Sequence, residues 1–253
     1  MERSHEPSEA TISMEMSECP GLRGSPKPGL PSAVENIFNA LRDEITQLNI
    51  RWETCMELFL EDESKSSLNE VAPGAFSVIW QVFKDDFFTT LYRITDPRES
   101  GPRANPNQNL TLDQLHHAID SSCNDRTFLQ AITERLHEID SHCKPIRKIR
   151  EKIIGHFDMP TILEPNSNPL PNVTWEDLKK ALQLLAEFMN EISVHFTGGY
   201  IDFVPTITGP AKNIVYGLRE FKRLQLLEYE QQQAELREEI EQNAIISSGD
   251  PAH

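Results

Sequence analysis

Residues 32–59 read SAVENIFNALRDEITQLNIRWETCMELF, and their apolar side chains recur alternately three and four positions apart. This spacing places them on one face of a helix, because an α-helix has 3.6 residues per turn. Ser32 and Glu35 have the spacing of a capping box, which marks a helix start. The stretch therefore predicts a long amphipathic helix whose apolar face comprises Phe38, Leu41, Ile45, Leu48, Trp52, Cys55 and Phe59.

Five further segments have the same helical periodicity, and each begins at a residue type that favours helix starts. They are expected to begin near Pro73, Thr111, Asp125, Thr174 and Pro210. No stretch of any length alternates apolar and polar residues as a half-buried strand does, except the short run at residues 200–204. We therefore predict an all-α bundle of five or six helices.

Prolines and glycines predict where these helices stop or bend. Asp96-Pro97 should end the second helix, because the residue before a proline disfavours the helical conformation. Gly198-Gly199 should end the fifth helix. Pro145 should kink or restart the fourth helix, because it removes a backbone donor and crowds the preceding turn.

The two ends of the chain differ in composition from its middle. Residues 1–31 are rich in proline, glycine, serine and charge, and no aromatic residue precedes Phe38, so we expect a disordered tail. Residues 32–227 should form the helical domain, and residues 228–253 an acidic helical extension and tail. The formal net charge is −16; residues 1–30 contribute −2 and residues 228–253 contribute −6. Half of the charge therefore lies in the ends.

Composition also excludes several classes of protein. No stretch approaches the roughly 18 consecutive apolar residues that a membrane span needs, so we expect neither export nor membrane insertion. The four cysteines are far apart and form no C-x-x-C pair, which argues against a disulfide framework or a cysteine zinc site. A cytoplasmic location fits these features best.

The one concentration of positive charge lies between residues 144 and 152. Its members are Lys144, Arg147, Lys148, Arg150 and Lys152, and the only acid among them is Glu151. Such a run is often the solvated face of a helix. On a chain this acidic, however, a basic run that leads to His156 also indicates a local site for an anion, in which Lys144, Arg147 and Lys148 would contact RNA.

Arg150 and His156 together offer a permanent cation and a proton-transfer group. These two groups suffice in principle to cleave RNA without a metal, because the 2′-hydroxyl of the substrate is the nucleophile. Six steps along an unbroken α-helix leave the two side chains about 120° apart, so Gly155 should end the helix and let His156 turn back. A two-fold dimer would supply a second histidine.

The string Lys148-Ile149-Arg150-Glu151-Lys152-Ile153-Ile154-Gly155-His156-Phe157-Asp158 resembles the signature of the HEPN superfamily of helical nucleotide-binding domains. It is most similar to the branch named after abortive-infection protein U, with Gly155 where alanine is usual. The stretches at residues 91–97, 109–112 and 200–205 also resemble this branch. The similarity covers about residues 34–225.

The resemblance implies a dimeric, metal-independent ribonuclease that often serves as a toxin or phage-defence effector. Arg150 would hold the phosphate, His156 would be the general acid or base, and Glu151 would be the polar residue after the arginine. Lys152, Arg93, Asp96 and Asp158 are expected to support this site. Arg93 and Asp96 can equally be a local helix-end ion pair and cap, and Asp158 can either orient His156 or cap a turn.

Other readings of the same residues lead to different functions. His156 and Asp158 have no further ligand nearby in sequence, so we expect no metal and no cofactor. The pairs His116-His117 and His137 with His142 should lie on helix surfaces. The alternative to a ribonuclease is a non-catalytic helical module of a defence or toxin–antitoxin system. Its acidic C-terminal helix would bind a basic partner, and an antitoxin or a nucleotidyltransferase is the expected companion.

Overall fold

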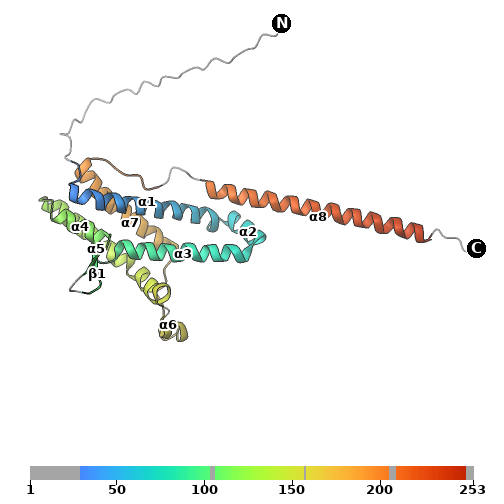
Figure 1. Ribbon diagram of the computed structural model, residues 1–253, viewed down its shortest axis with the longest axis horizontal. Helices are drawn as coiled ribbons and strands as arrows, with labels where there is room; N and C mark the ends of the chain where they lie inside the picture. The colour runs from blue at the N-terminus through green and yellow to red at the C-terminus, as the bar shows by residue number, and fades with distance from the viewer. Residues whose placement is uncertain (1–28, 103–105, 157, 205–208, 249–253) are drawn as a thin grey trace, which may run out of the picture.

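The computed structural model describes residues 29–102, 106–156, 158–204 and 209–248. The tail predicted at residues 1–31 lies outside the described residues up to position 28. The described residues form eight α-helices, one π-helical segment and two short strands (Figure 1). In chain order these are α1 (Ser32–Phe59), α2 (Asp62–Val71), α3 (Pro73–Thr95), β1 (Glu99–Ser100), β2 (Asn107–Gln108), α4 (Leu112–Asp120), α5 (Arg126–Ile149), η1 (Arg150–Gly155), α6 (Met159–Leu163), α7 (Trp175–Thr197) and α8 (Pro210–Ser248). The predicted all-α fold is confirmed.

Helix α1 is the central element of the bundle and contacts α2, α3, α4, α7 and α8. All seven apolar positions predicted for its inner face are buried. The capping box predicted from Ser32 and Glu35 is wrong, because Ser32 lies inside the first turn and Pro31, which has no side-chain acceptor, occupies the N-cap position. Burial of the apolar face, rather than a cap, therefore stabilises this helix.

Aromatic rings from three helices fill the junction of α1, α3 and the start of α7. Trp175, the first residue of α7, has its ring centroid 4.7 Å from that of Trp80 and 5.6 Å from that of Trp52. Trp52 in turn meets Phe87 edge-on at 5.6 Å. Tilted and edge-to-face pairs of this kind contribute about 0.5–1.5 kcal/mol each beyond their burial. The phenylalanines and the tryptophan of α3 are therefore buried in the core or packed against it.

Helix α5 continues through Pro145 as far as Ile149, so the restart predicted at this proline is wrong. Cys143 and Ile146 are buried on either side of Pro145, and their burial offsets the loss of one backbone hydrogen bond. The α-helical geometry ends later, at Arg150, where η1 begins.

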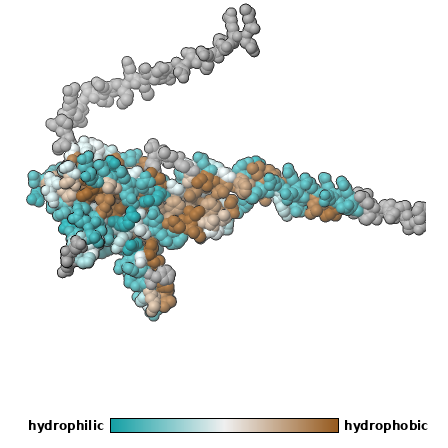
Figure 2. Space-filling model, viewed as in Figure 1, coloured by the Kyte–Doolittle hydropathy of each residue, from teal (hydrophilic) through white to brown (hydrophobic). Residues whose placement is uncertain are grey.

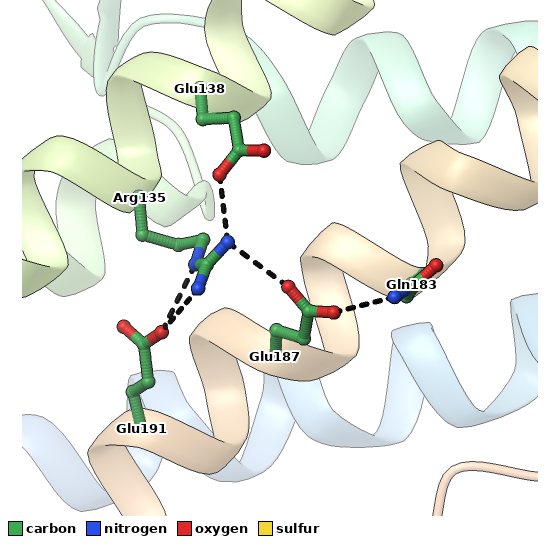
Figure 3. Close-up of polar contacts among 5 residues, drawn as sticks. All are labelled: Arg135, Glu138, Gln183, Glu187 and Glu191. Atoms are coloured by element: carbon green, nitrogen blue, oxygen red, sulfur yellow. Dashed lines mark hydrogen bonds and ion pairs between the residues drawn. The ribbon is translucent and has the colours of Figure 1, made fainter.

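A polar network joins α5 to α7 (Figure 3). The guanidinium of Arg135 contacts the carboxylates of Glu138, Glu187 and Glu191 at 2.7, 3.0 and 2.9 Å. Gln183 also donates a hydrogen bond to Glu187 at 2.7 Å. The hydrogen bond to Glu191 is the main cause that raises the pKa of Arg135 above its usual range. The network fixes the two helices against each other at a half-exposed edge.

Two short helices, α2 and α6, were not predicted. They have only ten and five residues, too few to show a clear helical period. The run at residues 200–204 is not a strand; Asn190 of α7 holds it by accepting a hydrogen bond from the Ile201 amide at 2.7 Å and donating one to the Ile201 carbonyl at 2.9 Å. Among the described helices, none combines the length and hydrophobicity that crossing a membrane requires.

Helix α8 begins beside α1 and α2 and then projects far beyond the rest of the described chain (Figure 1). The helix predicted to begin at Pro210 continues without interruption to Ser248. The Glu- and Gln-rich extension is therefore the second half of the same helix.

Candidate functional site

The basic run ends in a wide helical turn. In η1, which follows α5 directly, the amide of His156 donates a hydrogen bond of 3.1 Å to the carbonyl of Glu151, five residues earlier. Such π-helical turns are rare and occur frequently at functional sites. The wider turn brings Gly155, rather than His156, directly against Arg150.

Gly155 leaves space for the Arg150 side chain. A Cβ atom added to Gly155 would lie 2.9 Å from Nη1 and 3.2 Å from Cζ of Arg150, which is closer than van der Waals contact permits. Gly155 does not have a positive φ. The helix does end at this glycine, as predicted, but the residue is needed here for the close approach of a guanidinium and not for a left-handed turn.

Arg150 lies over an aromatic ring of α3. Its Cζ atom is 4.1 Å from the ring centroid of Tyr92, and a cation–π contact of this kind contributes about 0.5–1 kcal/mol. The Nε atom of Arg150 is buried and has no hydrogen-bond partner among the described residues. An unsatisfied buried donor is costly, so this atom is a polar group that the described contacts leave unexplained.

Asp96 lies near both arginines of the run. Burial raises the pKa of the Asp96 carboxyl, while the charges of Arg147 and Arg150 and a hydrogen bond from the Tyr92 hydroxyl act in the opposite direction. Arg147 donates hydrogen bonds to the carbonyls of Thr95 at 3.0 Å and Asp140 at 3.2 Å. It also pairs with the Asp140 carboxylate. Arg147 therefore joins α5 to the end of α3 and is not free to bind RNA through these donors.

A pocket of about 430 Å³ opens beside these residues. Asp96, His137, Asp140 and Arg147 are among the side chains that line it. Its polar rim carries both signs of charge, so it lacks the uniformly positive lining that a polyanion needs.

His156 is exposed and has an extended backbone just beyond η1. The following turn is held by Asp158, which accepts hydrogen bonds from the amide and hydroxyl of Thr161 at 3.2 and 2.5 Å and pairs with Lys152 at 2.9 Å. The Thr161 hydroxyl and then Lys152 hold the pKa of Asp158 below its usual range. Of the two roles predicted for Asp158, capping of the turn is the one that its contacts support.

The remaining predicted residues separate into two groups. Arg93 points to α1, where it pairs with Glu44 at 3.2 Å, and so it is not joined to Asp96 as a local ion pair. Lys144 and Lys148 are exposed on α5 and make no ion pair with any described residue, and Glu151 is exposed beside them. The structure thus brings Arg150, Asp96 and Arg147 together, directs Arg93 elsewhere and leaves His156 exposed just beyond Gly155.

Tyr92 is the residue that the sequence reasoning missed. It lies four positions before Asp96, one helical turn away, and so shares a face of α3 with it. The position of Tyr92 one turn before Asp96 was the signal in the sequence, because an arginine drawn to the acid can also stack on the ring.

Two of the other histidines lie between helices rather than on surfaces. His116 hydrogen-bonds through Nε2 to the Thr133 hydroxyl at 2.8 Å, and His142 donates to the Asp177 carbonyl at 2.7 Å. Both are half-buried, so the prediction of a surface position is wrong for them, whereas His117 is exposed. Within the described residues, no three His, Cys, Asp or Glu side chains gather closely enough to hold a metal ion.

Comparison with known proteins gives one match. A protein-family model of the HEPN group, described as AbiU2, matches residues 31–214. Searches of curated proteins and of solved structures found no match. The matched range contains every element from α1 to α7 and the first turn of α8.

Proposed function

The chain belongs to the AbiU2 family of HEPN proteins, and we propose that it is a metal-independent endoribonuclease that acts as a toxin or phage-defence effector. The observation that carries this proposal is Arg150. Its guanidinium lies against Tyr92 and Gly155 and has an unpaired buried donor, and the exposed His156 follows Gly155 in the chain.

The proposed chemistry needs no nucleophile from the protein. The 2′-hydroxyl of the RNA attacks its own phosphate, while Arg150 donates hydrogen bonds to the phosphoryl oxygens, on which negative charge increases. His156 takes the proton from the 2′-hydroxyl or gives one to the leaving 5′-oxygen, since an imidazole does either near neutral pH. Lys144 and Lys148, which are exposed on the preceding turns, would contact the flanking phosphates.

A second copy of the chain would complete the site. One His156 cannot be both the base and the acid of the same in-line reaction, whereas a two-fold dimer supplies two. Hydrophobic residues gather over the first half of α3 and over α6 (Figure 2); α3 contacts η1, and α6 follows η1 in the chain. The exposed ones are Val78, Ile79, Val82, Met159, Ile162 and Leu163. We propose that the partner copy covers this surface.

Cleavage of a single-stranded RNA in the presence of EDTA tests the proposal. His156→Ala and Arg150→Ala should each reduce the cleavage rate by at least ~10²-fold, the usual contribution of a proton-transfer or charge-stabilising group. His117→Ala and Arg126→Ala, which remove exposed residues of the same types elsewhere, should cleave at the wild-type rate. Full activity in His156→Ala, with a wild-type circular dichroism spectrum, would show that the proposed mechanism is wrong.

A second candidate is a non-catalytic interaction module, and the exposed acidic half of α8 favours it. In this case the chain would bind a protein companion, such as an antitoxin or a nucleotidyltransferase, and would cleave no RNA at any protein concentration. Copurification of a stoichiometric partner together with the absence of ribonuclease activity would favour this function over the first.

A further inference from the structure

The first residues of α8 are fastened to α1. The Glu57 carboxylate, nearly buried on α1, accepts hydrogen bonds from the amides of Gly209 at 2.6 Å and Ala211 at 3.2 Å. Free amides at a helix start carry partial positive charge, so a carboxylate there is stabilising. The direction of α8 is therefore set at its first turn.

The same half of α8 packs on α2 through an apolar strip and opposite charges. Val215 is buried and Leu218 packs against the core. Beside them the bases of α8 pair with acids of α2 and of the residue before it: Lys212 with Glu61 at 2.8 Å, Arg219 with Glu63, and Lys222 with Glu70 at 3.2 Å. The chain thus binds its own helix through an apolar strip and complementary charges beside it.

Beyond Lys222 the helix leaves the body. We call residues 223–243 the distal half of α8; its side chains are exposed except for half-buried Gln233. From residue 223 to the end at Ser248 the helix extends roughly 39 Å at 1.5 Å per residue. Most helices in proteins are stabilised by packing of an amphipathic face, and the distal half has no such packing here.

An apolar stripe nevertheless continues along the distal half. Leu226, Tyr229, Leu236 and Ile240 repeat at helical spacing and are exposed. At about 100° per residue they span an arc of about 80°, which includes the direction in which Val215 faces the body. With half-buried Gln233 at the position between Tyr229 and Leu236, the steps alternate between three and four residues, the spacing of a helix seam that receives a second helix. The packing face of α8 therefore extends past the end of α2.

The charges of the distal half have the opposite sign to those of the first half. Glu230, Glu239 and Glu241 lie about 90–110° from the centre of the stripe, the positions that meet the edges of a partner helix. Arg237 is the one base within residues 228–243. Arg237 lies at the edge too, about 65° from the centre of the stripe, so three acids against one base leave the edges acidic on balance.

A second copy of this chain fits this surface poorly. In parallel it would set acidic edges against each other. In an antiparallel dimer, the acidic edges of one copy would need the bases in the first half of the other copy's α8. Those bases already pair with Glu61, Glu63 and Glu70 of their own chain. We propose that the distal half of α8 is the docking surface for a basic amphipathic helix of another protein. That helix buries the apolar stripe and places its lysines or arginines beside Glu230, Glu239 and Glu241. This surface does not depend on ribonuclease activity.

A designed peptide tests the surface. The probe is a labelled four-heptad peptide with leucine at the a and d positions and lysine at e and g, and the matched control has glutamate in place of lysine. Fluorescence anisotropy measures their binding to the full-length chain. The lysine peptide should bind and the glutamate peptide should bind at least ~100-fold more weakly, because its charges repel the acidic edge.

Two double variants locate the binding site. Leu236→Ala with Ile240→Ala removes the stripe, while Leu224→Ala with Leu227→Ala removes similarly exposed residues about 150° away. Alanine preserves helix propensity in both. The first variant should weaken binding of the lysine peptide at least ~10-fold, and the second less than ~2-fold.

Three results would overturn the proposal. The first is failure of the lysine peptide to bind, and the second is an equal loss of binding in the two double variants. The third is a dimer of the chain alone that dissociates in Leu236→Ala with Ile240→Ala, since the occupant would then be a second copy. None of these readouts involves RNA cleavage, so they are independent of the proposed enzymatic function.

Discussion

At the scale of single residues, the candidate site depends on an absent side chain. Arg150 lies over Tyr92 in a space that a Cβ on Gly155 would enter. The arginine is therefore oriented before any ligand binds, which reduces the entropy that a flexible side chain loses on binding.

The substitution Gly155→Ala should move the guanidinium off Tyr92, because the new Cβ would stand 2.9 Å from Nη1. Tyr92→Leu should then cost less free energy of unfolding in the alanine background than in the wild type, by about 0.5–1 kcal/mol, the contribution of a cation–π contact. Urea denaturation of the four proteins in this double-mutant cycle measures the difference. Equal costs in the two backgrounds would show that the arginine keeps its place.

His116 should make the protein less stable in mild acid. Burial lowers the pKa of His116, although Asp120 and Asp113 oppose this. The unfolded chain therefore takes up a proton first, and the free energy of unfolding falls as the pH drops from about 6.5 through the lowered pKa. His116→Gln should lose less stability than the wild type between about pH 7 and pH 5 in urea titrations. His117→Gln is the control, and a curve identical to wild type in His116→Gln would contradict the prediction.

At the scale of elements, two helix starts with the same motif behave differently. Thr174 and Asp177 form a complete capping box at the start of α7, with reciprocal hydrogen bonds of 3.2 and 2.8 Å. Ser32 makes no cap at the start of α1. Thr174→Ala should therefore cost about 0.5–2 kcal/mol of unfolding free energy, and Ser32→Ala less than about 0.5 kcal/mol. Similar losses in the two variants would refute this distinction.

The contribution of Arg135 to the packing of α5 against α7 should depend on the salt concentration. Arg135→Ala leaves Glu187 and Glu191 facing each other without the shared cation. We expect the unfolding free energy to fall by about 1–2 kcal/mol. This is less than the loss for a fully buried ion pair, because the arginine is partly exposed and water screens its charge. The loss should shrink as salt rises from about 0.05 to 0.5 M. A loss that does not change with salt would indicate packing by the arginine stem instead.

At the scale of the whole molecule, the acidic extension should oppose RNA. Deleting residues 228–253, which carry a net charge of −6, changes the formal net charge from −16 to −10. In an inactive His156→Ala background, the shortened chain should bind a short single-stranded RNA more tightly at low salt. This difference in RNA affinity between the shortened and full-length chains should vanish above about 0.3 M salt, because charges are then screened within a few ångströms. Anisotropy titrations at two salt concentrations measure it, and equal affinities at low salt would contradict it.

The helices themselves could be predicted from the sequence. Apolar periodicity in residues 32–59, and start and stop residues such as Pro73, Thr174 and Gly198, depend on local spacing and backbone preference. The short helices α2 and α6 lacked enough residues to show a period. The basic run and its closing His156 were also visible, because they are neighbours in the chain.

Only the tertiary structure decided which of these residues meet. Arg147 lies against Thr95 and Asp140, Arg93 lies against Glu44, and Arg150 lies on Tyr92, and each of these contacts except the one with Asp140 joins helices far apart in sequence. The passage of α5 through Pro145 also depended on burial of its neighbours. Local spacing determines a helix and its faces, whereas the pairing of side chains depends on how those faces pack, and packing is a property of the whole chain.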